Sequence, residues 1–227
     1  MLLIAGCGGS SGAGPTSVPP TPTGTPGDPV ATAEFQALGK KFEALAGFDV
    51  MYDVKSTSDG KSTLSATMSA TQKGNQTRSL FDGTVNGTHT KLLTIFDGKH
   101  LYICDEATTK ACVEPAPGPN LRDPLVIYSP AGIVQGVLGS DNITVHKADA
   151  QTIAGVTAAC YRLNQTTSQS LYCFDPTTGM LLLVDGTTTS NGKPATTTMR
   201  ATQASASAQS IDLNPPYKVQ AEPTPTP

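Results

Sequence analysis

From Phe48 onward, apolar and polar side chains alternate with a period of two, and no other feature constrains the fold more strongly. Every second residue of Phe48–Val54 is apolar, as expected of a strand that buries one face. Turn signals such as Asp59-Gly60 recur about every 8–12 residues, a spacing typical of antiparallel strands joined by hairpins. The many threonines fit such strands, because β-branched side chains suit a pleated, half-exposed surface. The sequence therefore predicts a long antiparallel meander.

A helical pattern precedes the strands, in residues 31–46. One apolar stripe at helical spacing is formed by Phe35, Leu38, Phe42 and Leu45. Asp28-Pro29 supplies an N-cap and a first-turn proline, and Gly47 supplies a C-terminal stop. We expect an amphipathic helix whose stripe lies on the sheet.

Residues 115–139 interrupt the strand pattern with an apolar segment bounded by prolines. Ser129-Pro130 has the form of a helix start, and the apolar residues after it end at Gly139. Two interpretations stay open: a short helical flap over the sheet, or a surface loop with one apolar side. Periodicity does not decide between them.

A change of composition at both ends divides the chain into four parts. Residues 8–29 and 220–227 have almost no apolar side chains to bury, so we expect a disordered Gly/Ser/Pro/Thr tether and a disordered Pro/Thr tail. Residues 30–219 are long enough for one domain with its own core. Residues 1–7 are interpreted as the remnant of a lipoprotein signal peptide.

The reason for that interpretation is Ile4-Ala5-Gly6-Cys7, which resembles the lipobox of bacterial lipoprotein signal peptides. In a lipobox, small residues precede a cysteine that receives a diacylglycerol. We expect Cys7 to be this acylated residue, so that the domain is extracytoplasmic and lipid-anchored to the bacterial cell membrane. A signal peptide also needs a basic start and a longer apolar stretch, so we expect its true start upstream of Met1. The alternative is a chance cysteine in a Gly-rich leader.

Four further cysteines favour two disulfides. Cys104 and Cys112 flank one polar turn, and Cys160 and Cys173 flank another. Folding each segment as a hairpin brings its two cysteines together across the strands. Four cysteines allow three pairings, and this local context favours Cys104–Cys112 with Cys160–Cys173. One alternative is four buried free thiols. Another is a zinc site, but the spacings between these cysteines are not those of zinc ligands. Disulfides persist outside the cytoplasm, in agreement with the lipobox.

Charge and motifs exclude several function classes. The formal net charge is −3, from 15 basic and 18 acidic residues, without the Lys/Arg cluster of a nucleic-acid binder. No apolar stretch reaches the ~18–20 residues of a membrane-spanning helix. The motifs of a serine nucleophile elbow, a phosphate-binding loop and a zinc protease are absent from the sequence. The sequence therefore predicts no enzyme, no catalytic residue, no metal site and no cofactor.

Two segments resemble the LolA/LolB-like superfamily of bacterial lipoproteins, which includes LppX/LprG-like members. Phe96–Ile103 (FDGKHLYI) is similar to the strand entry of that family, and Tyr172–Leu181 (YCFDPTTGML) to its late hairpin. The resemblance spans about residues 30–219 and implies an α+β fold. The implied architecture is a strongly curved antiparallel β-sheet, a half-barrel, packed on the N-terminal amphipathic helix and a short mid-chain helical insertion.

The resemblance also implies an apolar hollow that accepts acyl chains. We expect its lining to come from the strands and the insertion: Met51, Leu64, Met68, Phe81, Ile95, Leu101, Ile103, Ile127, Ile133, Leu138, Leu181, Leu183 and Met199. The alternative is that the same residues form a dry core, as most apolar residues on strands do.

Two functions follow from these alternatives. In the first, the chain is a monomeric, membrane-anchored lipoprotein that binds or carries lipid in its apolar concavity. In the second, it is an envelope protein that binds a protein partner or senses the state of the envelope. A carrier predicts a connected internal apolar cavity, whereas a partner-binding protein predicts a filled core with an exposed apolar patch or an open edge strand.

Overall fold

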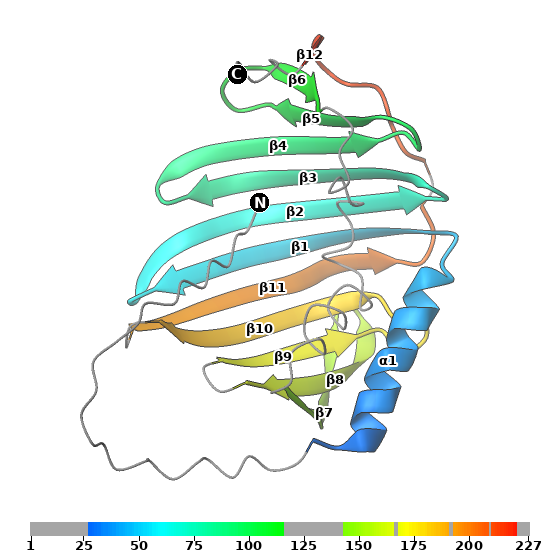
Figure 1. Ribbon diagram of the computed structural model, residues 1–227, viewed down its shortest axis with the longest axis vertical. Helices are drawn as coiled ribbons and strands as arrows, with labels where there is room; N and C mark the ends of the chain where they lie inside the picture. The colour runs from blue at the N-terminus through cyan, green and yellow to red at the C-terminus, as the bar shows by residue number, and fades with distance from the viewer. Residues whose placement is uncertain (1–26, 116–142, 166–167, 191–192, 209, 222–227) are drawn as a thin grey trace, which may run out of the picture.

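The computed structural model describes residues 27–115, 143–165, 168–190, 193–208 and 210–221. These residues form one α-helix and one twelve-stranded sheet (Figure 1). The helix α1 spans Pro29–Glu43. The strands are β1 Gly47–Ser58, β2 Lys61–Lys73, β3 Gln76–Val85, β4 Thr88–Phe96, β5 Leu101–Asp105, β6 Ala111–Glu114, β7 Thr144–Ile153, β8 Val156–Asn164, β9 Ser168–Phe174, β10 Leu181–Ser190, β11 Lys193–Ser205 and β12 Val219–Ala221.

The sheet joins two antiparallel meanders, β1–β6 and β7–β11, through the pairing of β1 with β11. The strand order is β12-β6-β5-β4-β3-β2-β1-β11-β10-β9-β8-β7, so the first strand lies in the middle of the sheet. All neighbouring strands are antiparallel except β12, which pairs parallel with β6. The sequence-based prediction of a curved, mostly antiparallel sheet with an N-terminal helix is confirmed at this level.

The helix begins where the sequence predicts it. A carboxylate oxygen of Asp28 accepts hydrogen bonds from the backbone amides of Val30 and Ala31, which have no partner within the helix. Phe35 is fully buried, with edge-to-face ring contacts to Tyr161 and Phe174. The apolar stripe therefore fixes α1 against the second meander.

Gly179 lets the turn between β9 and β10 approach the helix closely. Its φ is +74°, and a Cβ at this position would collide with the carbonyl oxygen of Leu38. This explains the glycine of the Asp175–Gly179 segment, in which Asp175 accepts a hydrogen bond from the amide of Thr177.

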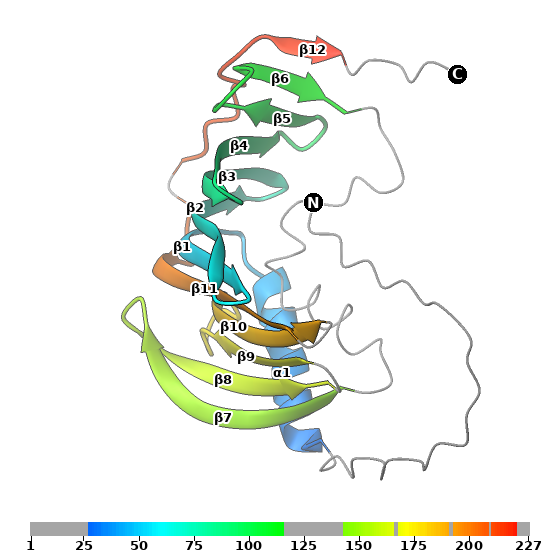
Figure 2. The same ribbon diagram turned by 90° about the vertical axis from the view of Figure 1, so that its left-hand side faces the viewer.

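We call the side of the sheet that α1 packs on the helix face, and the opposite side the outer face. Figure 2 shows the helix on one side of the sheet and the segment that leads to β12 on the other. Phe48, Val50, Tyr52 and Val54 on β1 point to the helix face and are at most 5% exposed. The faces of the residues on all the remaining strands follow from strand pairing, because directly paired residues point to the same face.

The outer face of β4–β6 has its own core, which the last part of the chain closes. Leu93, Ile95 and the disulfide Cys104–Cys112 are at most 1% exposed there. The residues that pack over them from the C-terminal segment are Leu213, Tyr217 and Val219. The segment is held at its end by β12 and by the amide of Cys112, which donates to the carbonyl of Lys218.

Both predicted disulfides are present. Cys104 pairs directly with Cys112 between β5 and β6, and Cys160 with Cys173 between β8 and β9. All four cysteines are at most 1% exposed. Each disulfide lies on the outer face, where it is buried, and it links the two neighbouring strands of one hairpin.

Two predicted features need a correction or fall outside the description. The tail predicted for residues 220–227 begins too early, because Gln220 and Ala221 pair with Val113 and Glu114 in β12. The short segment offers little apolar area, and its pairing depends on the exposed edge of β6, which the local sequence does not reveal. The helical insertion predicted within residues 115–139 falls almost entirely outside the described residues, so the structure does not confirm it.

The two faces of β4 give a test of the outer core. Replacing fully buried Ile95 by Ala should lower the free energy of unfolding by about 2–5 kcal/mol. The substitution would leave a cavity in the core that the C-terminal segment covers. Replacing Leu92, which is 39% exposed on the other face, should cost less than about 1 kcal/mol. Urea denaturation of both variants measures the difference, and equal losses would contradict the assignment of faces.

Candidate functional site

The helix face is covered over one half of the sheet. Among the described elements, α1 is the one that packs on this face, and it lies over the second meander and the start of β1 (Figures 1 and 2). No other described helix or strand lies over the helix face of β3–β6. This half, over which no described element lies, is the first candidate for a functional surface.

Strand pairing sets apolar side chains next to one another on this half. Met68, Phe81 and Leu92 form a direct row across β2, β3 and β4. Neighbouring rows of the same face bring further apolar side chains from β2 to β6. Together they form what we call the open patch: Leu64, Met68, Phe81, Val85, Leu92, Phe96, Leu101, Ile103 and Val113.

The open patch is only half-buried, in contrast to the outer face of the same strands. Leu92 is 39% exposed, and the other members are of intermediate exposure. On β4 itself, Leu93 and Ile95 point the other way and are at most 1% exposed. An apolar surface left half-open beside a sealed core commonly marks a binding surface.

One carboxylate lies in the rows of the open patch, and its own turn satisfies it. Asp105 pairs with Leu92, and its side chain accepts hydrogen bonds from the amides of Ala107, Thr108 and Thr109 at 2.9–3.1 Å. These amides, that of Thr108 foremost, hold the pKa of the Asp105 carboxyl below its ordinary value. The described side chains of the patch therefore present apolar or neutral polar groups, apart from this turn-bound carboxylate.

Five of the predicted lining residues come together in the open patch. Leu64, Met68, Phe81, Leu101 and Ile103 all point to the helix face on β2–β5. Leu64 and Met68 also contact the central core, so the patch continues into it.

Other predicted lining residues lie elsewhere. Met51 is 40% exposed and Ile95 is fully buried, but both point to the outer face. Leu181, under the helix beside Phe35, is a core residue, and so is Leu183, which pairs with disulfide-bonded Cys173. Met199 points to the helix face but packs against the cores under α1. Strand position alone does not tell which face of the sheet is covered.

Four predicted functional residues fall outside the described part of the chain. They are Cys7, Ile127, Ile133 and Leu138.

Leu92 and Phe96 were not among the predicted lining residues, and the reason is physical. The strand TKLLTIF contains two apolar doublets, Leu92-Leu93 and Ile95-Phe96, so both phases of the alternation look equally apolar. The pairing of Leu92 with Phe81 selects the phase that faces the helix side. Val85 and Val113 were missed because each lies at a strand end, where alternation is short.

A hollow of about 550 Å³ exists elsewhere and has a different lining. It lies against β7, β8 and β9, and polar residues such as His146 and Arg162 surround it. The open patch is thus a surface and not the lining of this cavity.

Two further observations concern the described residues alone. Their one helix has 15 residues, and it does not meet the length and hydropathy that crossing a bilayer requires. Their His, Cys, Asp and Glu side chains form no group of three or more that could hold a metal ion.

Comparison with known proteins finds similarity in structure and not in sequence. No protein-family model matches the chain, and no curated protein matches it. The crystal structure of MucB matches at 11% identity with a TM-score of 0.49, over 84% of this chain. The chain spans 64% of the length of that protein. MucB has also been solved in complex with MucA.

Two other solved structures also match the chain. LprF from Mycobacterium bovis matches at 13% identity with a TM-score of 0.46, over 85% of this chain and all of LprF. The LolA superfamily protein NE2245 from Nitrosomonas europaea matches at 9% identity with a TM-score of 0.28, over 74% of this chain and 91% of its own. At such identities and TM-scores, the function has to be inferred from this chain's own residues.

The turn at Asp105 predicts a dependence of stability on pH. Because the folded pKa of Asp105 lies below the unfolded value of about 3.9, its contribution is complete above that value and is lost as the pH falls through the folded pKa. Wild type should therefore lose more stability than Asp105→Asn between pH 6 and pH 3. Urea denaturation across this range measures it, with Asp53→Asn on the exposed side of β1 as the control. Equal pH profiles for wild type and Asp105→Asn would contradict the role of the turn.

Proposed function

We propose that the chain is an extracytoplasmic lipoprotein that binds the acyl chain of a lipid on its open patch. The observation that carries the proposal is the contrast between the two faces of β4. One face is sealed by the C-terminal segment, while Leu92 and its neighbours Phe81 and Met68 stay partly accessible on the other. Burial of this area by an apolar ligand is favourable at about 25 cal/mol per Å².

The shape and chemistry of the patch suit an acyl chain. It runs across five strands, β2 to β6, which at about 4.8 Å between strands gives a length of about 19 Å. An extended acyl chain of a membrane lipid has this length scale. The row from Met68 through Phe81 to Leu92 offers an apolar surface to a ligand, as expected of a site that recognises apolar area and not a polar headgroup.

A second occupant, an apolar segment of a protein partner, is favoured by a different observation. The patch is open along the face of the sheet and is not the lining of the hollow at β7–β9. The partner-binding hypothesis predicts a filled core with an exposed apolar patch. The same surface would then receive a protein, so the experiments must distinguish the two occupants.

We further propose that Cys7 is acylated and holds the domain at a membrane. The two disulfides support an oxidising, extracytoplasmic compartment, because such bridges are rare in the cytoplasm. The described chain begins at Gly27, where Asp28 donates its amide to the carbonyl of Val145 on the edge strand β7. The tether was predicted to span residues 8–29, but Asp28 caps α1 and Pro29 begins it, so the last residues of that range belong to the domain. The tether would therefore leave the domain at the β7 edge.

Two equally exposed residues on opposite faces test the lipid proposal. Leu92→Asp places a charge in the open patch, whereas Met51→Asp places the same charge on the outer face of β1, and the two side chains are 39% and 40% exposed. Titration with a fluorescent fatty acid should show saturable binding to wild type and Met51→Asp. Leu92→Asp should bind at least about tenfold more weakly, because a desolvated carboxylate disfavours the apolar ligand.

Native mass spectrometry of the protein from its own membranes separates the two occupants. A co-purifying lipid that is lost in Leu92→Asp and kept in Met51→Asp supports lipid binding. A co-purifying protein with the same dependence on Leu92 supports the partner instead. Fatty-acid binding that is equal in both variants would reject the open patch as the site.

Anchoring at Cys7 has a separate test. Expressed with a complete signal peptide in a bacterial host, the wild-type chain should partition into detergent and carry the mass of an acylated N-terminal cysteine. Cys7→Ser should partition into the aqueous phase, because it has no thiol to acylate. An unmodified Cys7 in the mature wild-type protein would reject the anchor while leaving the open patch untouched.

A further inference from the structure

The hollow of about 550 Å³ at the β7–β9 end of the sheet is a second candidate site, and it is polar. Its volume is within the range of small-molecule sites. The described residues of its lining come from three neighbouring strands, and most of them are polar or charged. Its polar and charged members include His146, Lys147, Asp149, Arg162, Asn164 and Gln169.

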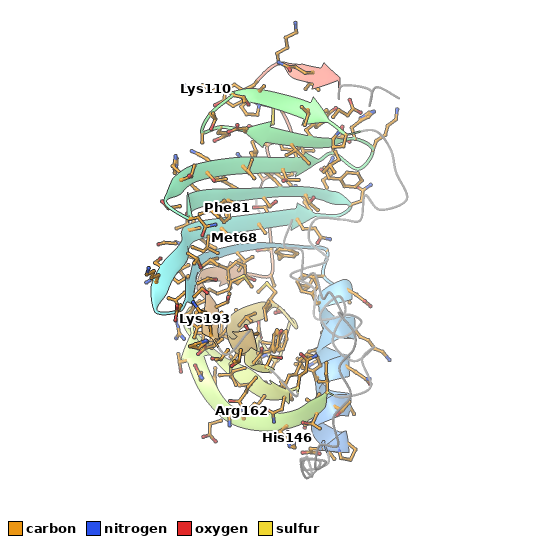
Figure 3. All side chains as sticks on the ribbon, turned by 60° about the vertical axis from the view of Figure 1, so that its left-hand side comes forward. Met68, Phe81, Lys110, His146, Arg162 and Lys193 are labelled. Atoms are coloured by element: carbon orange, nitrogen blue, oxygen red, sulfur yellow. A yellow bond between two sulfur atoms is a disulfide. The ribbon has the colours of Figure 1, made fainter. Side chains whose placement is uncertain are left out.

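The lining belongs mainly to the outer face. His146 and Arg162 pair directly across β7 and β8, and they alternate with Val145, Tyr161 and Leu163, which are buried beneath α1. Figure 3 shows His146 and Arg162 near one another at this end of the molecule. The same two strands thus present a core to the helix and a polar hollow to the other side.

A β-bulge shapes this part of the sheet. The pairing of β7 with β8 shifts register between Ala148 and Gln151, and such a shift bends a strand pair. The bend brings the tip of the hairpin back to β11, where the guanidinium of Arg200 donates to the carbonyl of Thr152 at 3.2 Å. Figure 2 shows the β7–β8 hairpin curving toward β11.

Two cationic side chains of the cavity differ in their partners. Lys147 is paired with Glu34 of the helix at 2.8 Å, and its hydrogen bond is the largest cause that lowers the pKa of that carboxyl. The side chain of Arg162 has no hydrogen bond or ion pair with any described residue, and the same holds for the side chain of its cross-strand neighbour His146. The guanidinium fork of Arg162 is therefore available for an external oxyanion, which it binds best in a bidentate manner.

Hydroxyl-binding groups lie beside these donors. Gln169 donates to the side-chain oxygen of Asn164 at 2.8 Å, which orients both amides and leaves the Asn164 NH₂ and the Gln169 oxygen for a ligand. Asp149, at the bulge, is a carboxylate among the described lining residues, and a carboxylate can accept hydrogen bonds from the hydroxyl groups of a ligand. Its negative charge also disfavours a ligand with several anionic groups.

We propose that this cavity binds a polyol or saccharide that carries one phosphate or carboxylate group. Arg162 and His146 would hold the oxyanion, while Asp149 and the Asn164–Gln169 pair would hold hydroxyl groups. The ligand is either a free sugar acid or sugar phosphate, or the inositol phosphate headgroup of a lipid. The site lies on the outer face at the β7 end, so it is distinct from the open patch on the helix face of β2–β6.

Calorimetric titration of the full chain with glucose 1-phosphate, glucuronic acid and glucose tests the free ligands. Cosedimentation with phosphatidylcholine vesicles, with and without phosphatidylinositol, tests the headgroup. Arg162→Gln should weaken acid binding at least about tenfold, because charge-assisted hydrogen bonds are lost. Arg78→Gln, the same change on β3 outside the cavity lining, should leave the affinity unchanged.

The outcomes separate the sources. Saturable binding of either acidic sugar identifies a free ligand, and binding to phosphatidylinositol vesicles alone identifies the headgroup, provided that each is lost in Arg162→Gln. His146→Gln replaces that variant if Arg162→Gln fails to fold. Glucose binding as tightly as its acids, equal affinity in wild type and Arg162→Gln, or no binding in either arm would overturn the proposal. Leu92→Asp should bind the sugar acids like wild type, so failure of the lipid proposal is distinguishable.

Discussion

The pairing of β1 with β11 is the interaction on which the rest of the structure depends. It joins the meander β1–β6 to the meander β7–β11, in a register that runs from Asp49 with Ser205 to Ser58 with Ala195. The hydroxyl of Tyr52 adds a buried link between the halves, since it donates to the carbonyl of Leu181 at 2.7 Å. The first strand is thereby at the centre of the sheet, flanked by strands that are near to it and far from it in sequence.

This arrangement explains why the two halves of the helix face differ. The helix immediately precedes β1, and its ring contacts hold it over β8 and β9, where Phe35 meets Tyr161 and Phe174. It therefore covers the second meander and leaves the first without a described cover. The C-terminal segment follows β11 and crosses the outer face of the first meander, which it seals. The open patch is what these two coverings leave accessible.

Individual strands show how well the alternation of apolar and polar residues identifies the functional face of the sheet. On β1 it separates Phe48 and Val50 from their polar neighbours, and the structure agrees. On β4 the doublets Leu92-Leu93 and Ile95-Phe96 fit both phases, and the sequence-based lining chose Ile95, which the C-terminal segment covers. The alternation of apolar and polar residues does not predict the polar hollow, because the hollow depends on a bulge in β7 and on the pairing of β7 with β8.

The sequence by itself determined the local elements: the helix with its Asp28 cap, the hairpins, and the disulfides, whose cysteines flank single turns. These features depend on interactions between residues that are close along the chain, so their signals are local. The tertiary structure decided which strand lies beside β1, which face of each strand is covered, and where His146 and Arg162 meet a hollow. Those features depend on contacts between distant residues, and a strand has the same alternation whichever neighbour or cover it acquires.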